Sequence, residues 1–280
     1  MNSPTTVLVN GEAQDQISIQ DRGFQFGDGV FETLAVCAGR PLLWERHLQR
    51  LLKGCARLRI EPPPVAHVLR SEAEQLCVGV QRAVLKLVVT RGRSGQGYAL
   101  SDGATPTRVL AMRAWPSYPA RAAQTGVDVH LCRTRVSRNP QLAGIKHLNR
   151  LEQVLARAEW QREFAEGLMF DDADHLIEGT ASNVFVVSRG TLLTPDLSES
   201  GVAGIMRAMV LEYAEAAALP CKITGITRSQ LDSIEEIFLS NSLIGIWPVR
   251  RVESKVYSPG EVTRRVQRGT REYYCLDEAD

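Results

Sequence analysis

The clearest hydrophobic pattern in the N-terminal part of the chain has the spacing of an α-helix. Four leucines and a cysteine, at positions 48, 51, 52, 55 and 58, fall on one helical face, which predicts an amphipathic helix over residues 45–60. The prolines at 62–64 end it, and a second helix is predicted over residues 65–77. Apolar runs bounded by turn residues predict strands around these helices. These runs cover residues 6–11, 30–44 (with a turn at 38–40), 82–92 and 107–115.

The pattern changes at residues 116–126, which hold two prolines and small residues without a period. We place the interdomain linker there. It separates a smaller N-terminal α/β domain, residues 1–115, from a larger C-terminal domain, residues 127–280, that carries Lys146. In the second domain we expect strands at residues 127–134, 167–172, 175–180, 183–188 and 236–240, and helices just after Lys146, over 203–219 and over 262–274. The mixture predicts two α/β or α+β domains with a cleft between them, a common place for a ligand.

Charge and composition narrow the function. The net charge is +1 over 280 residues, which does not favour nucleic acid as a partner. No apolar run is long enough for a membrane span, and the N-terminus lacks the form of a signal peptide. The six cysteines are scattered without a C-x-x-C pair, which predicts reduced thiols and neither a zinc site nor a disulfide framework. We therefore expect a cytoplasmic protein without a metal.

Lysine is rare in this chain: only five of the 33 basic residues are lysines, and one of them, Lys146, follows the apolar stretch LAGI. A desolvated lysine amine can lose its proton and attack a carbonyl, whereas a guanidinium stays charged. Lys146 is therefore a candidate for a Schiff base, although a lysine that extends to water from a strand edge would show the same pattern. Lys86 is the rival candidate, but strand alternation places it on the solvent side.

Four other segments add chemistry that fits such a lysine. Gly201 and Gly204 precede a helix whose N-terminus could bind a phosphate, although a glycine turn of this kind can also simply begin a helix. Glu178 stands between apolar strands, where it could hold a proton on a ring nitrogen or simply form a turn. Arg46 is a cation in the first turn of a helix, where the helix dipole disfavours positive charge. A bound anion would compensate this cost; alternatively, Arg46 is a surface charge. The cluster Ser240–Ser242 ends a strand or forms a polar turn. Together these parts are those that pyridoxal 5′-phosphate (PLP) requires.

Five motifs, in order, resemble the fold-type IV PLP enzymes, whose members include D-amino-acid aminotransferases, branched-chain aminotransferases and aminodeoxychorismate lyases. They are DRGFQFGDGVFET, ERHLQRL, NPQLAGIKHLNRLEQVLARAE, EGTASNVF and GVAGIMR. The resemblance implies a two-domain fold like that of D-amino-acid aminotransferases, with the cofactor between the domains, and a homodimer. It implies that Lys146 forms the Schiff base and that Glu178 pairs with the pyridine nitrogen. It assigns the phosphate to Arg46, to the backbone of Ile205 and Met206, and to Asn241 and Ser242, and places Asn183 near the ring.

Within this family the chain looks most like the aminodeoxychorismate lyases. Gln96 and Tyr98 stand where D-amino-acid aminotransferases carry the arginine and histidine that bind the substrate carboxylate, and Phe31 stands where they have a tyrosine. Met206 departs from the family, whose members often have a threonine there. The resemblance implies conversion of 4-amino-4-deoxychorismate to 4-aminobenzoate and pyruvate, with Lys146 as proton carrier. Candidates for the two substrate carboxylates are Arg91, Arg93 and Arg22. An aminotransferase or a catalytically silent PLP-binding protein would use the same parts.

Overall fold

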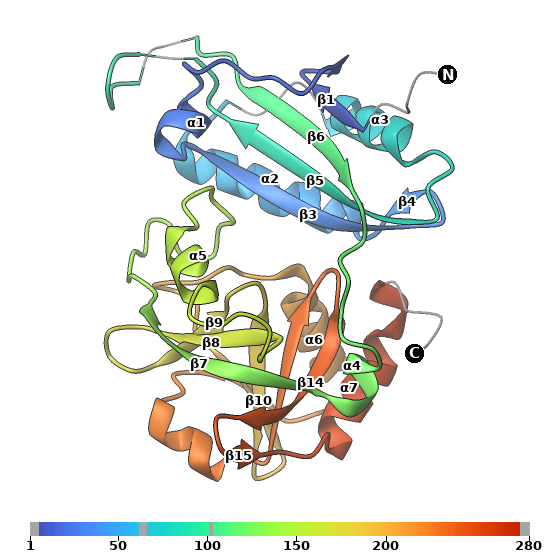
Figure 1. Ribbon diagram of the computed structural model, residues 1–280, viewed down its shortest axis with the longest axis vertical. Coiled ribbons are helices and arrows are strands. Elements are labelled where there is room, and N and C mark those ends of the chain that lie inside the picture. The colour runs from blue at the N-terminus through green and yellow to red at the C-terminus, as the bar shows by residue number, and fades with distance from the viewer. Residues whose placement is uncertain (1–5, 62–65, 94, 101–102, 275–280) are drawn as a thin grey trace. The chain divides into compact units, whose positions relative to one another are not determined.

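The computed structural model describes residues 6–61, 66–93, 95–100 and 103–274 and divides into two compact units (Figure 1). The first unit comprises Met1–Pro116 together with Ile145–Asn149, and the second comprises Ser117–Gly144 and Arg150–Asp280. The chain thus passes between the units at residue 116, at the start of the stretch expected to be a linker. The short segment that contains Lys146 groups with the first unit, although the residues on both sides of it belong to the second.

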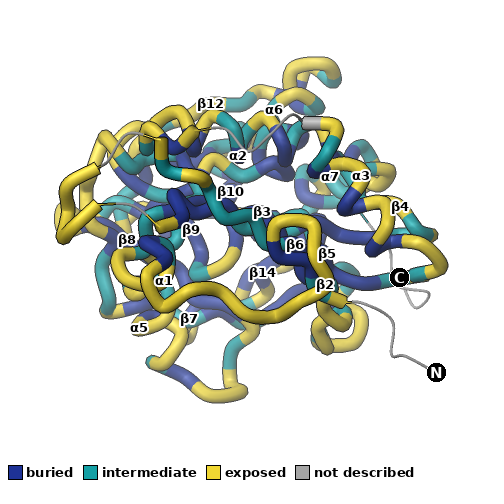
Figure 2. The backbone as a smooth tube through the Cα atoms, turned by 90° about the horizontal axis from the view of Figure 1, so that it is seen from above, coloured by how far each residue is buried: buried dark blue, intermediate teal, exposed yellow. Residues whose placement is uncertain are grey.

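The first unit is a six-stranded antiparallel sheet covered by helices on one face (Figure 1). The strand order is β2 (Glu12–Ala13), β1 (Val7–Val9), β6 (Thr107–Arg113), β5 (Arg82–Thr90), β3 (Gly29–Cys37) and β4 (Arg40–Pro41). The long central strands β3 and β5 are coloured mainly as buried in Figure 2. Their apolar side chains pack against α2 (Trp44–Leu58) and α3 (Ala66–Cys77), and α1 (Arg22–Phe26) precedes β3.

The second unit is built on a nine-stranded mixed sheet. Its main path runs β12 (Cys221–Thr224), β11 (Thr191–Pro195), β10 (Asn183–Ser188), β13 (Glu236–Asn241), β14 (Gly245–Val252), β7 (Val127–Arg135), β8 (Glu166–Phe170) and β9 (Leu176–Gly179), with β15 (Lys255–Val256) paired to β14. The helical segments are α4 (Ala122–Thr125), α5 (Leu151–Arg157), α6 (Ile205–Ala216), η1 (Arg228–Ser233), α7 (Glu261–Thr270) and η2 (Arg271–Tyr273). Both α6 and α7 contact β13 and each other. Apolar residues of β10 and β13 contribute to the main core of this unit.

Several expected elements are confirmed, with shifted ends. The helix predicted over 45–60 is α2, that over 203–219 is α6, and that over 262–274 ends as an α-helix at Thr270 before a 3-10 turn. The prolines at 62–64 and Val65 lie outside the described residues. Strands β11, β12, β14 and β15 were not expected. The strand expected after the turn at 38–40 is only the two-residue β4.

The helix expected just after Lys146 begins later than the pattern indicated. It starts at Leu151, because Leu148 belongs instead to an extended segment whose backbone bonds to β3. Three of the apolar residues whose spacing indicated this helix, Leu151, Val154 and Leu155, are 60–76% exposed. The prediction of a helix is therefore correct from residue 151 onward.

Two further expectations concern the cysteines and the membrane. Cys55, Cys77, Cys132 and Cys221 are free thiols, but Cys37 is disulfide-bonded, so the prediction of reduced thiols is wrong at that position. No helix in the described part of the chain is both long and apolar enough to cross a bilayer.

Candidate functional site

Lys146 lies in an extended segment that pairs with the beginning of β3 in the first unit. The Phe31 amide donates to the Lys146 carbonyl at 2.9 Å, and the Leu148 amide donates to the Gly29 carbonyl at 2.9 Å. A Cβ at Gly29 would stand 2.6 Å from the Val89 carbonyl oxygen and 2.7 Å from the Leu148 side chain, so the close approach requires glycine. The half-buried Lys146 places its Nζ 4.6 Å from the centroid of the Phe31 ring. Lys86 Nζ lies 5.2 Å from the centroid of the same ring, but Lys86 is exposed on β5, as expected.

A buried polar cluster that sequence reasoning missed lies next to this segment. Glu32, fully buried on β3, is 2.7 Å from His47 Nδ1 and accepts from Arg50 Nε at 2.8 Å; both partners are on α2. Burial raises the pKa of Glu32, but the charge and hydrogen bonds of Arg50 and the hydrogen bond of His47 outweigh it and lower the pKa to about 2. An acid inside an apolar strand was the available indication.

His47 connects this cluster electrostatically with Lys146. Burial lowers the pKa of His47, and the neighbouring Glu32 only partly opposes that effect. The positive charges of Arg50 and Lys146 lower the pKa further. Burial and the neighbouring positive charges thus favour the neutral form of His47. Arg46, the residue expected at the phosphate, is half-buried in the first turn of α2, one turn before Arg50.

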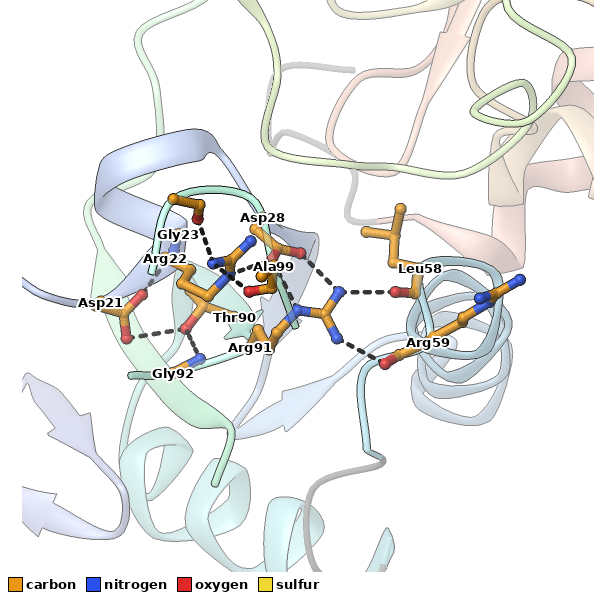
Figure 3. A network of polar contacts seen from close by, with 11 residues as sticks. Asp21, Arg22, Gly23, Asp28, Leu58, Arg59, Thr90, Arg91, Gly92 and Ala99 are labelled. Atoms are coloured by element: carbon orange, nitrogen blue, oxygen red, sulfur yellow. Dashed lines mark hydrogen bonds and ion pairs between the residues drawn. The ribbon is translucent and has the colours of Figure 1, made fainter. Parts of the chain in front are cut away.

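Two of the three arginines expected to bind substrate are already held by protein groups (Figure 3). Arg91 donates to Asp28 through Nε at 2.7 Å and Nη2 at 3.0 Å, and to the carbonyls of Leu58 and Arg59 at 2.7 and 2.6 Å. Arg22 donates to Asp28 at 2.9 Å and to the Gly97 carbonyl at 2.8 Å. Burial raises the pKa of Asp28, but the two arginines outweigh it and lower the pKa. These arginines join α1, α2 and the loop around residue 97.

Arg93 is arranged differently from Arg22 and Arg91. It is exposed, and its Nη2 donates to the Gln20 side chain at 2.6 Å. An exposed arginine bonded to a neutral amide can change partners at lower cost than one held by a buried carboxylate. Of the three arginines, Arg93 is thus the one that a substrate carboxylate could recruit without breaking an ion pair within the described residues.

In the second unit, Glu178 and Asn183 stand at the two ends of the turn between β9 and β10 and bond to one residue. The Val202 amide donates to Glu178 Oε2 at 2.8 Å, and Asn183 Nδ2 donates to the Val202 carbonyl at 2.9 Å. Both side chains are buried, and Gln153 of α5 lies 3.4 Å from the other oxygen of Glu178. The segment before α6 is therefore fixed to the two side chains expected beside a cofactor ring.

The N-terminus of α6 is tightly packed and has free donors. Its N-cap is Gly204, where a Cβ would stand 1.9 Å from Asn183 Oδ1, so no other residue fits without movement. No side chain caps this end, and the amides of Ile205, Met206 and Arg207 have no acceptor within the described part of the chain. Free amides and the positive end of the helix dipole favour an anion here. The Met206 side chain is fully buried, so only its backbone can serve.

The turn at Asn241 and Ser242 is hydrogen-bonded to the turn between β9 and β10. Asn241 Oδ1 accepts from the amides of Leu243 and Ile244 at 2.8 and 2.9 Å, and its Nδ2 donates to the Ala181 carbonyl at 3.0 Å. The Asn241 side chain is thus committed to holding two turns together. Ser242 is half-buried in the same turn.

Glu166 is a second buried acid that the sequence did not single out. From β8 it accepts hydrogen bonds from the Thr180 and Ala181 amides at 3.0 Å each, from Ser182 Oγ at 3.0 Å, and from the Thr180 hydroxyl. These bonds fix Thr180, Ala181 and Ser182, the three residues between β9 and β10. An acid that begins an apolar strand, as in EGLMF, was the indication in the sequence.

Known proteins similar to this chain were found by sequence and by structure. The family model for amino-transferase class IV matches residues 29–252. An aminodeoxychorismate lyase of Vibrio harveyi is 36% identical over 264 residues, covering 92% of this chain and 97% of the relative. A D-alanine aminotransferase of Bacillus licheniformis is 29% identical, covering 93% of this chain and 94% of the relative.

Solved structures give a consistent result. The crystal structure of 4-amino-4-deoxychorismate lyase from Pseudomonas aeruginosa superposes with a TM-score of 0.90 at 48% identity, covering 95% of this chain and 98% of that one. The branched-chain amino acid aminotransferase of Escherichia coli has a TM-score of 0.82 at 22% identity, covering 99% and 97%. The second likeness concerns the fold alone. The fold-type IV architecture expected from the motifs is therefore confirmed.

Proposed function

Because the chain belongs to the amino-transferase class IV family, we propose that it is a PLP-dependent lyase that converts 4-amino-4-deoxychorismate to 4-aminobenzoate and pyruvate. The main support is the pair of full-length relatives that carry this lyase name, at 36% and 48% identity. The two aminotransferases are less similar, at 29% and 22%. The products place the reaction in folate biosynthesis, and we propose a cytoplasmic homodimer.

The residues present fit PLP. The cofactor needs an amine, an acid for its ring nitrogen and donors for its phosphate. Lys146 supplies the amine, the buried Glu178 supplies the carboxylate, and the α6 N-terminus supplies amides without acceptors. Arg46, Asn241 and Ser242 complete the proposed phosphate site, with Asn183 near the ring. When bound, PLP links to the substrate amine and accepts the electron pair that remains after a C–H bond is broken.

A short chain segment and two hydrogen bonds link Lys146 to Glu178. Gly144, two residues before Lys146, bonds through its amide to the Gly201 carbonyl at 2.9 Å. The next residue, Val202, donates to Glu178. Two residues of extended chain span at most about 7 Å, so the Lys146 Cα lies within that distance of the Gly144 Cα. This connection supports the proposal that the amine and the carboxylate serve one cofactor.

In the proposed reaction Lys146 moves a proton. Its neutral amine takes the proton from the ring carbon that bears the substrate nitrogen. The C–O bond to the enolpyruvyl group then breaks and the ring becomes aromatic. The protonated amine gives its proton to the departing group, which becomes pyruvate. Glu178 keeps the proton on the ring nitrogen, and Arg93 is our first choice for a substrate carboxylate, with Arg91 and Arg22 the other candidates.

A product assay tests this proposal. PLP-loaded protein is supplied with aminodeoxychorismate generated in situ from chorismate, and 4-aminobenzoate and pyruvate are measured together. Equimolar, enzyme-dependent release of both supports the lyase. Release of a keto acid from D-alanine or a branched-chain amino acid, without 4-aminobenzoate, would replace the lyase with an aminotransferase. Inactivity with all of these substrates despite bound PLP would contradict both enzymes and leave a PLP-binding protein.

A further inference from the structure

Ser240 carries a buried hydroxyl that the proposed function does not use. The residue is 1% exposed at the end of β13, and its Oγ has no hydrogen-bond partner within the described part of the chain. Buried side-chain oxygens nearly always have a partner, because an unpaired one loses its bonds to water without replacement. An exception beside a proposed ligand site indicates a partner that the polypeptide itself does not supply.

The strand register places this hydroxyl beside the α6 N-terminus. Ser240 pairs with Asn183 across the β13–β10 ladder. Side chains alternate between the two faces of a strand. Leu239 and Val184 point into the main core of the unit, so Ser240 and Asn183 share the opposite face. Asn183 Oδ1 lies against Gly204, the N-cap of α6.

Phe185 and Phe238 confirm that this face is continuous. They belong to the same two strands, and their rings stack at 4.9 Å between centroids. Both rings are fully buried, and α6 is in contact with β13. The hydroxyl of Ser240 therefore stands on the face of the sheet that α6 contacts, at the end marked by Asn183 and Gly204.

The donors collected here are of one kind. The amides of Ile205, Met206 and Arg207 can only donate, and a serine hydroxyl can donate as well. Such a set is complementary to an anion with several oxygen acceptors. Met206 has no side-chain hydroxyl, so any hydroxyl at this site comes from outside the helix. Ser240 on β13 is such a source, in addition to the Ser242 already proposed. Resting on the proposed function, we infer that Ser240 Oγ is a further ligand of the PLP phosphate, donating a hydrogen bond that holds it at the α6 N-terminus.

The test compares PLP with pyridoxal, which lacks the phosphate, in wild-type protein and Ser240→Ala. Dissociation constants are measured from the change in cofactor absorbance. We expect Ser240→Ala to weaken PLP binding roughly tenfold to a hundredfold, as for loss of a hydrogen bond to a charged group. Pyridoxal binding should not change. The melting temperature of the cofactor-free variant should not fall, because the hydroxyl that is removed has no partner in the protein.

Thr270→Val is the matched control. It removes a fully buried hydroxyl of the same unit that donates to the Val266 carbonyl at 2.9 Å. This variant should melt earlier with or without cofactor and should bind PLP as the wild type does. Equal PLP binding by Ser240→Ala and wild type would overturn the role of Ser240 and leave the cofactor proposal intact. Equal weakening for PLP and pyridoxal would also overturn it, by indicating a structural effect. If wild-type protein bound no PLP, the proposed function would fail, and this inference with it.

Discussion

At the residue scale, the candidate site depends on buried charges whose partners are remote in sequence. Rarity and context identified Lys146 as a candidate, and the exposed position of Lys86 agrees with simple strand alternation. Glu32, Arg50 and Glu166 were not identified, because their partners come from another strand, helix or turn. Local patterns describe which face a residue occupies, whereas a buried ion pair is defined only when two elements pack.

Glu32 predicts a specific pH dependence of stability. Its folded pKa of about 2 lies below the ordinary value of 4.5, so the carboxylate stabilises the folded state above pH 4.5 and loses that effect as the pH falls toward 2. Glu32→Gln should lower the free energy of unfolding at pH 7 by about 3 kcal/mol, because Arg50 loses its buried partner. When the free energy of unfolding is measured in urea, the difference between wild type and variant should shrink as the pH falls from about 5 to about 2.

Glu45→Gln is the control for this experiment. Glu45 lies on the same helix, but its side chain is 64% exposed and its ion pair with Arg70 is at the surface. Such pairs contribute at most about 1 kcal/mol. A Glu32→Gln difference that stayed constant down to pH 2 would contradict the assignment of a charged, paired Glu32.

Substitutions of Arg91 and Arg93 should have different effects, the first on stability and the second on substrate binding. Arg91→Gln removes two bonds to Asp28 and two to backbone carbonyls, and should cost about 3 kcal/mol of unfolding free energy. Arg93→Gln should cost less than about 0.5 kcal/mol, because the residue is exposed, but should raise KM for the substrate. Urea unfolding and steady-state kinetics measure the two effects. A stable Arg91→Gln protein with a raised KM would reverse the assignment.

At the element scale, periodicity predicted where helices form more reliably than what packs against their apolar faces. The helix that became α2 was predicted nearly to its ends, since its apolar face packs on β3 and β5. The pattern after Lys146 has the same appearance, yet α5 exposes Leu151 and Val154 and begins only after the segment paired with β3. Hydrophobic spacing indicates that a face can be buried and does not indicate what covers it.

The turn between β9 and β10 should depend on Glu166. Glu166→Gln keeps the shape of the side chain but replaces one acceptor oxygen by a donor, which faces the donors of the turn. We expect faster hydrogen exchange at the Thr180 and Ala181 amides and weaker PLP binding, because the turn holds Glu178 and Asn183. Exchange monitored by mass spectrometry measures the first effect. Glu163→Gln, in an exposed loop, is the control, and equal exchange in both variants would exclude a special role for Glu166.

At the scale of the whole molecule, the sequence predicted the fold class through its motifs rather than through its periodicity. The order of six strands in one unit and nine in the other follows from long-range pairing, such as the parallel contact of β14 with β7. Local patterns contain no information on such partners, and they missed four strands of the second unit. The five motifs supplied that architecture, and the comparisons confirm it.

The central claim is that Lys146 is the amine that anchors PLP. The most direct test is borohydride reduction of PLP-loaded protein, followed by digestion and mass spectrometry of the labelled peptide. We predict one label per chain, on the peptide that contains Lys146, unchanged in Lys86→Ala and lost in Lys146→Ala. A label on Lys86 or any other lysine, or full labelling of the Lys146→Ala protein, would contradict the account.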